Sequence, residues 1–179
     1  MKKTVSLIII ALFFISTAIN AQKNSFFVAA GPTTGTSFNN HFSVPWGASL
    51  KVRYGVSKAG SITGDVSYLG LLPNNPMTTF NTSIVSVKGG FLTYIKNTHL
   101  FVQADLGFFY TKYKSVVHTV SGLYFITGLG AGYSFLISKK SSIDISTNIN
   151  YVSQANTISP AWLLINLAYR FKLKSNKSK

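Results

Sequence analysis

The sequence predicts an all-β fold, in which eight antiparallel strands form an up-and-down transmembrane β-barrel preceded by a cleavable signal peptide. Three observations lead to this prediction. Apolar and polar residues alternate along many segments, as the two faces of a strand require. The links between these segments alternate between short and long. After the N-terminal segment, no apolar run reaches the ~18 residues that a membrane-spanning helix needs.

The alternation is clearest at residues 46–56, WGASLKVRYGV. One face is apolar and carries an amphipathic aromatic near each end, Trp46 and Tyr54, whereas the other face is small or cationic and includes Lys51 and Arg53. Eight residues at ~3.3 Å rise and ~40° tilt span roughly 20 Å, close to the ~25 Å apolar band of an outer-membrane barrel. The segment therefore predicts a strand with one face toward lipid.

Similar alternation recurs along the rest of the chain. In two further segments, for example, Asp65 lies on the face opposite Ile62 and Val66, and Asp144 on the face opposite Ile143 and Ile145. We expect eight strands, at residues 25–31, 46–56, 61–69, 83–95, 100–112, 122–136, 142–152 and 161–173.

The expected links suggest an orientation. Outer-membrane barrels have short periplasmic turns and longer extracellular loops, so both chain termini are expected on the short-turn, periplasmic side. Lys58-Ala59-Gly60 also fits a three-residue hairpin loop with a left-handed glycine at its end. Short links are expected at 57–60, 96–97 and 137–141, and long links at 32–45, 70–82, 113–121 and 153–160.

Residues 1–21 have the three parts of a secretory signal peptide. A lysine pair precedes the apolar run 5–15, and small residues follow it. Ile19 and Ala21 occupy the −3 and −1 positions, so cleavage is expected before Gln22, after Sec-type export. A retained signal anchor is the alternative, but the apolar run is short for a membrane span.

Composition excludes several other classes of protein. The chain has 17 Lys and Arg against 3 Asp and Glu, a formal charge of +14. Such a balance is typical of nucleic-acid binders. Here the cations cluster at expected turns and at the C-terminus, and no basic face carries interleaved aromatics, so we expect no nucleic-acid partner. The absence of cysteine excludes disulfides, thiolate zinc sites and cysteine nucleophiles.

The aromatic residues fall near the two ends of the expected strands. Amphipathic rings of this kind mark the headgroup level of a membrane barrel. Core aromatics of a soluble β-protein are the alternative interpretation. The expected outer ring holds Trp46, Tyr68, Tyr110 and Tyr151, and the expected periplasmic ring holds Tyr54, Tyr133, Phe135, Tyr169 and Phe171.

The last segment carries a resemblance to a known family. Its apolar positions alternate to a terminal aromatic, at Leu163, Ile165, Leu167, Tyr169 and Phe171. In this and in its overall pattern, residues 22–179 resemble the small outer-membrane β-barrel proteins of the OmpA-transmembrane-domain and OmpX type. The resemblance implies recognition by the barrel-assembly machinery during insertion. Two departures are Asn166, where the family's signal usually has glycine, and a short basic tail at 172–179.

With polar faces inward, all three acids of the chain point into the lumen together with several cations. An eight-stranded barrel has room only to pack its own side chains, so the lumen is expected to be closed. Buried charges are tolerated when they are paired. The side chains expected to form lumen ion pairs are Arg53, Asp65, Lys88, Asp105, Asp144 and Arg170.

Hairpin register suggests the pairs. If residues 58–60 form the first turn, Arg53 faces Asp65. If residues 96–97 form the second turn, Lys88 faces Asp105. For Asp144 the neighbouring strand offers Arg170, although the long loop between them leaves this register open.

No catalytic, cofactor or metal site is expected. A hydrolase or acyltransferase site needs a base oriented by a carboxylate beside a nucleophile. His41 and His118 fall in expected loops, His99 falls at the periplasmic rim, and none has an acid nearby in the inferred fold. Two loop histidines alone are weak support for a metal site.

We therefore expect a monomeric, integral outer-membrane protein that is structural or interacts through its extracellular loops, with outer-membrane lipids and lipopolysaccharide as partners. Two alternatives stay open: a lipid-modifying outer-membrane enzyme, and a soluble periplasmic ligand-binding barrel similar to a lipocalin. The last would have an apolar lumen and a polar exterior.

Overall fold

A computed structural model describes residues 24–38, 42–73, 81–96, 98–114, 119–138, 140–153 and 161–175. The expected signal peptide, the two loop histidines and the end of the basic tail lie outside these residues. The described chain is entirely strand and connection. The strands are β1 (Ser25–Ser37), β2 (Phe42–Gly55), β3 (Gly60–Pro73), β4 (Asn81–Tyr94), β5 (Leu100–Lys114), β6 (Thr119–Leu136), β7 (Ser141–Val152) and β8 (Ala161–Ser175).

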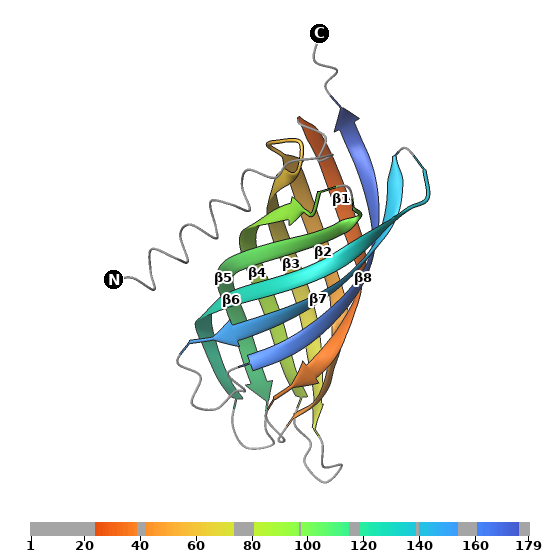
Figure 1. The fold of residues 1–179 in the computed structure, drawn as a ribbon. Coiled ribbons are helices and arrows are strands. Elements are labelled where there is room, and N and C mark those ends of the chain that lie inside the picture. The colour runs from red at the N-terminus through yellow and green to blue at the C-terminus, as the bar shows by residue number, and fades with distance from the viewer. Residues whose placement is uncertain are drawn as a thin grey trace, which may run out of the picture.

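The strands close into one antiparallel barrel, as the sequence predicted (Figure 1). Each strand pairs with its neighbours in sequence, and β8 returns to pair with β1, so no sheet edge is left open. No helix within the described ranges is long and apolar enough to cross a membrane.

The barrel has two different ends. At the end we call the turn side, β1 begins, β8 ends, and the links after β2, β4 and β6 return the chain (Figure 1). At the opposite end, the loop side, lie the links after β1, β3, β5 and β7. Both described termini therefore lie on the side of the links that we predicted to be short.

The strands extend further toward the loop side than predicted. β1 continues through Pro32 to Ser37 and β2 already begins at Phe42, so most of the loop expected there is ladder. Pro32 lies opposite Ala48, and Pro45 follows a register irregularity between β2 and β3. A barrel strand accommodates proline at an outward position such as that of Pro32 and next to an irregularity such as that before Pro45.

The first hairpin corrects the predicted turn. Gly55, not Ser57, lies opposite Ser61, so the register differs by two residues from the prediction. The hydroxyl of Ser57 accepts hydrogen bonds from the backbone N–H groups of Gly60 at 2.7 Å and Ala59 at 3.3 Å. No described glycine has a positive φ, so the predicted left-handed glycine is wrong.

The second hairpin shows the same error. The backbone N–H of Ile95 donates to the carbonyl oxygen of Leu100 at 2.9 Å, so Ile95 is not opposite Thr98, as the predicted turn at residues 96–97 would require. The hydroxyl of Thr98 donates to the carbonyl oxygen of Ile95 and accepts from the N–H of Leu100. This side chain stabilises a longer turn than the two residues assumed.

The two faces of each strand are chemically opposite, and the outer face is the apolar one. On β5, Leu106 and Phe108 are 60% and 56% exposed, whereas Asp105 between outward neighbours is 6% exposed. A strand places alternate side chains on opposite faces, so this pattern fixes which residues line the lumen. All the girdle residues lie on the outer face, and most are strongly exposed: Trp46, Tyr54, Tyr68, Tyr110, Tyr133, Tyr151, Tyr169 and Phe171.

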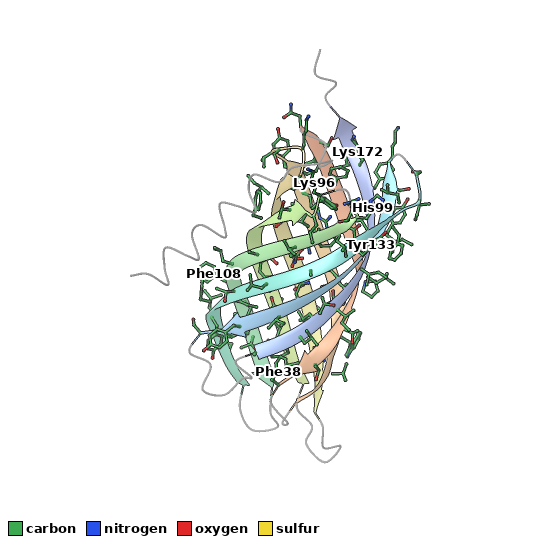
Figure 2. All side chains as sticks on the ribbon, viewed as in Figure 1. Phe38, Lys96, His99, Phe108, Tyr133 and Lys172 are labelled. Carbon is green, nitrogen blue, oxygen red and sulfur yellow. The ribbon has the colours of Figure 1, made fainter. Side chains whose placement is uncertain are left out.

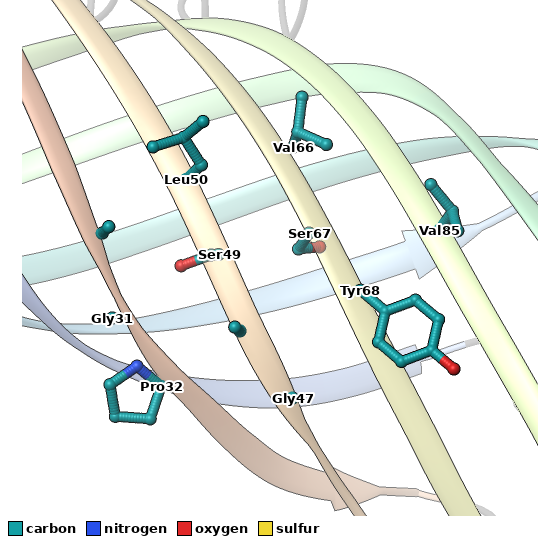
Figure 3. A pocket seen from close by; sticks show the side chains of 11 residues that line it. Gly31, Pro32, Gly47, Ser49, Leu50, Val66, Ser67, Tyr68 and Val85 are labelled. Atoms are coloured by element: carbon teal, nitrogen blue, oxygen red, sulfur yellow. The ribbon is translucent and has the colours of Figure 1, made fainter.

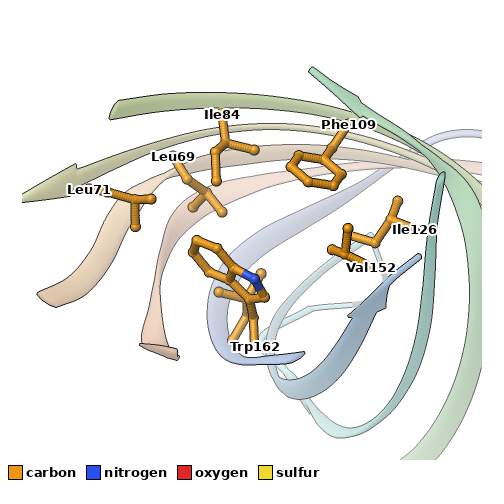
Figure 4. Packing of buried hydrophobic residues seen from close by; sticks show 8 residues of the cluster. Leu69, Leu71, Ile84, Phe109, Ile126, Val152 and Trp162 are labelled. Carbon is orange, nitrogen blue, oxygen red and sulfur yellow. The ribbon is translucent and has the colours of Figure 1, made fainter. Parts of the chain in front are cut away.

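The loop-side half of the lumen is filled by apolar side chains (Figure 4). Phe109 stacks on Tyr124 at 5.2 Å between ring centroids, and Trp162 approaches from β8. This apolar plug consists of Leu69, Leu71, Ile84, Phe109, Ile126, Val152, Trp162 and Leu164, with Tyr124 packed against it.

Glycine permits the tight curvature of the wall at two inward positions. A Cβ at Gly47 would lie 1.8 Å from the carbonyl oxygen of Tyr68 on β3. A Cβ at Gly107 would lie 2.1 Å from the carbonyl oxygen of Val87 on β4. Neighbouring backbones therefore approach more closely here than any side chain allows.

Candidate functional site

The chemistry-bearing residues of the described chain gather in the turn-side half of the lumen. Asp65 lies at its middle, directly opposite Lys51 on β2 and Lys88 on β4. Each ammonium nitrogen is 3.9 Å from a carboxylate oxygen of Asp65. The predicted pairing of Asp65 with Arg53 is wrong, because Arg53 lies opposite Thr63.

Asp105 has polar rather than ionic contacts. It lies opposite Gly90, and Lys88 lies opposite Gly107, so the predicted Lys88–Asp105 register is also wrong by two residues. The side-chain amide of Gln103 donates to Asp105 at 3.0 Å. Within the described ranges, no Lys or Arg nitrogen lies within 4.0 Å of the Asp105 carboxylate.

Amides connect this middle layer across the lumen. The ammonium group of Lys51 donates to the side-chain oxygen of Gln103 at 3.1 Å, and that of Lys88 donates to Asn150 at 3.2 Å. Gln103 also donates to Asn148 on β7. Strands on opposite walls are therefore linked through side chains that have little room to move.

A second cluster lies nearer the turn side. Arg53 Nη1 is 2.9 Å and Arg170 Nη1 is 3.6 Å from Oδ2 of Asp144, which is 2% exposed. Both guanidinium groups donate to the hydroxyl of Tyr94. The Arg53 guanidinium also stands 5.0 Å from the centre of the Phe101 ring, a cation–π arrangement.

The lumen is therefore a charged, packed interior beneath an apolar plug. Its four buried cations, Lys51, Arg53, Lys88 and Arg170, face the three acids of the chain. Paired charges of this kind are held in place, because removing one partner leaves the other buried and uncompensated. The arrangement favours a structural network over an open channel.

Catalytic and metal-binding arrangements are not evident in the described part of the chain. No group of three or more His, Cys, Asp or Glu side chains is placed to hold a metal ion there. His99 lies on the outside of the turn-side rim, in edge contact with Tyr133, whereas the acids lie inside the lumen. A base and a carboxylate are thus separated by the barrel wall.

An open groove of about 620 Å³ lies on the outer face of β1 to β4 (Figure 3). Its floor is formed by small residues such as Gly31, Gly47 and Ala48, and Leu50 and Tyr68 flank it. All its exposed side chains are apolar or aromatic, so the groove offers no chemistry beyond that of the surrounding apolar belt.

The sequence analysis missed several members of the lumen network. Gln103, Asn148 and Asn150 carry the links between charged groups, and Tyr94 joins the two arginines. Gln103, Asn148 and Asn150 each lie an even number of residues from the charged residue on their own strand. The two-residue period of a strand could therefore have placed them in the lumen. Tyr94 lies six residues after Lys88 on β4, so the same signal was available for it.

Comparison with solved structures shows which known proteins share this fold. Ail, the attachment invasion locus protein of Yersinia pestis, superposes with a TM-score of 0.61 at 16% identity, over 84% of this chain and 99% of Ail. Neisserial surface protein A gives a TM-score of 0.60 at 13% identity, over 83% and 96%. The chain has the fold of the small outer-membrane β-barrels. The predicted resemblance to the OmpA and OmpX type is confirmed at the level of fold.

A third barrel with this fold, OprG of Pseudomonas aeruginosa, gives a TM-score of 0.58 at 8% identity, over 86% of this chain and 98% of OprG. No protein-family profile matches the chain. No curated protein matches it by sequence either. Because the identities are low, the small outer-membrane barrels supply the architecture, and the role must be argued from the residues.

Proposed function

We propose that the chain is an integral outer-membrane barrel with a closed, charged lumen, which acts as a structural or surface-interaction protein through its loop-side end. The inside-out distribution of polarity carries this proposal. Large apolar side chains are exposed on the outer face of β2 to β8, while every acid and four cations are buried within. Such a surface is stable in a bilayer, where every backbone group of a closed barrel is also hydrogen-bonded.

The same observation disfavours a soluble ligand-binding barrel. A lipocalin-like protein would place apolar side chains around an internal ligand and polar ones outside. Here the middle of the lumen holds Asp65, Lys51 and Lys88, and the exposed face holds residues such as Leu106 and Phe108. A lipid-modifying enzyme is less well supported, because the described acids are all enclosed in the lumen.

The orientation follows from the links. We place the turn side in the periplasm and the loop side at the cell surface, because the outer-membrane barrel rule assigns short turns to the periplasm. In this orientation Trp46 and Tyr68 lie toward lipopolysaccharide, and the loops are available for partners. Insertion would use the barrel-assembly machinery, and the closed ladder needs no second copy. Ail, a barrel of this fold, has been solved in complex with the heparin analogue sucrose octasulfate, which supports a surface-interaction role.

Extraction behaviour tests the proposal. The protein should remain with outer-membrane fragments after osmotic release of the periplasm and after a high-salt wash, and should dissolve only in detergent. Its detergent-solubilised form should migrate differently on a gel before and after boiling, because the closed barrel resists unfolding. Release with the soluble periplasmic fraction would contradict the proposal.

A further inference from the structure

The charge on the outside of the protein has a single sign. The chain has three acidic side chains and no glutamate, and all three acids, Asp65, Asp105 and Asp144, are buried in the lumen. Every ionised side chain on the exterior is therefore a cation. A surface with no acids to neutralise these cations attracts anionic groups over roughly a Debye length, about 8 Å at physiological ionic strength.

The exterior cations concentrate at the turn side. Lys58, Lys96 and Lys140 lie exposed in the links after β2, β4 and β6, and Lys172 lies at the mouth of the lumen near the end of β8. Figure 2 shows Lys96 and Lys172 at the same end of the barrel. By contrast, the loop-side end of β5 carries only Lys112 and, after it, Lys114. Further lysines adjoin the turn-side elements in sequence: Lys23, Lys139, Lys174, Lys177 and Lys179.

Aromatic side chains mark the level at which these lysines lie. His99 and Tyr133 are in edge contact on the turn-side rim, and Tyr133 lies 4.6 Å from Phe135 between ring centroids (Figure 2). Lys172 lies inside this rim, over the inward ring of Phe27, which also faces the Arg170 guanidinium. Amphipathic rings mark the boundary between hydrocarbon and headgroups, so the lysines lie at headgroup depth or just beyond it.

The spacing of the lysines indicates what they bind. Lys58, Lys96 and Lys140 come from three separate hairpins, so they are distributed around the rim. A compact anion requires donors that converge on one point, whereas phosphates of a lipid leaflet surround the barrel on all sides. Juxtamembrane lysines attract anionic lipid surfaces in this way.

We propose that Lys58, Lys96 and Lys140 form a cationic ring that binds the phosphate groups of anionic phospholipids in the leaflet at the turn side. The inference rests on the proposed membrane location and adds a preferred lipid class. It also gives the ring a role in holding the barrel at a fixed depth, because the lysines resist movement into the hydrocarbon.

Lipid retention measures this preference. The full chain is reconstituted into nanodiscs of equal parts phosphatidylglycerol and phosphatidylcholine, and lipids that stay bound are counted by native mass spectrometry. We expect phosphatidylglycerol to be enriched several-fold, given about fivefold for each lysine near an anionic surface. The combined variant Lys58→Gln, Lys96→Gln and Lys140→Gln should lose the enrichment, and so should the unmodified protein in about 1 M salt.

Lys112→Gln is the matched control, because it removes an exposed lysine at the opposite end. It should retain the full enrichment. Equal retention of the two lipids by the unmodified protein, or unchanged enrichment in the combined variant, would overturn the ring. If millimolar inorganic phosphate displaced phosphatidylglycerol, the lysines would form a site for small anions. That result would also overturn the proposed ring. Failure to enter nanodiscs of either lipid would instead contradict the proposed membrane location.

Discussion

Arg53 on β2 and Asp144 on β7 meet across the lumen, with Nη1 of the arginine 2.9 Å from Oδ2 of the aspartate. The two strands share no ladder, because β8 and β1 lie between them. Arg170 on β8 reaches the same carboxylate oxygen at 3.6 Å. One carboxylate thus connects β2, β7 and β8, so removing it should destabilise the whole barrel.

Replacing Asp144 with asparagine should lower the free energy of unfolding by ~3–5 kcal/mol, because two buried guanidinium groups lose their counter-ion. Urea unfolding in detergent micelles measures the change. Asp105→Asn is the matched control, since Asp105 is equally enclosed but contacts an amide rather than a cation at short range. A loss at Asp105 as large as that at Asp144 would contradict the assigned contacts.

The hairpin register has its own test. Residues directly opposite in an antiparallel pair have Cα atoms about 4.5–5.5 Å apart, within disulfide range. Lys51→Cys with Asp65→Cys should therefore form a disulfide on mild oxidation, seen as the loss of two hydrogen masses. Arg53→Cys with Asp65→Cys is displaced by two residues and should stay reduced. The reverse result would restore the register that the sequence suggested.

Lys51 and Arg53 show which features of the barrel can be predicted from the sequence. The period of two in segment 46–56 identified the strand and the inward face of Lys51 and Arg53, because lipid accepts only the apolar face. The register depends on where each turn begins. Ser57 and Thr98 decide that through side-chain hydrogen bonds, which residue type alone does not reveal.

Both register errors equal two residues, so every side chain kept its predicted face while its partner changed. This is why the set of lumen charges was predictable and the individual pairs were not. The Arg170–Asp144 contact is local to neighbouring strands, whereas the contact of Asp144 with Arg53 depends on barrel closure. Closure brings together residues that no hairpin argument connects.

Gly47 provides a test of the packed wall. A methyl group there would lie 1.8 Å from the carbonyl oxygen of Tyr68, so Gly47→Ala should destabilise the barrel by about 1–3 kcal/mol through forced backbone movement. Gly89→Ala is the control, because its nearest neighbour would be the carbonyl oxygen of Thr63 at 3.9 Å. Thermal unfolding of both variants measures the two losses of stability. Equal losses would contradict the close approach of the backbones at Gly47.

Protease treatment of intact cells tests the orientation. With the turn side in the periplasm, cleavage is expected only in the links at 38–41, 74–80, 115–118 and 153–160. Peptide mapping of the products identifies the sites. Lys140 provides a trypsin site in the link after β6, and it should be protected until the outer membrane is permeabilised. Cleavage there on intact cells would reverse the orientation.

The central claim is that the charged faces point inward and the apolar faces meet lipid. The cysteine-free chain allows single spin labels at each position from 102 to 110 along β5, with accessibility to oxygen and to a water-soluble nickel complex measured in bilayers. The structure predicts a period of two, with high oxygen accessibility at Ala104, Leu106 and Phe108 and low accessibility at Gln103, Asp105 and Phe109. Accessibility with the opposite phase, or with no period of two, would contradict the account.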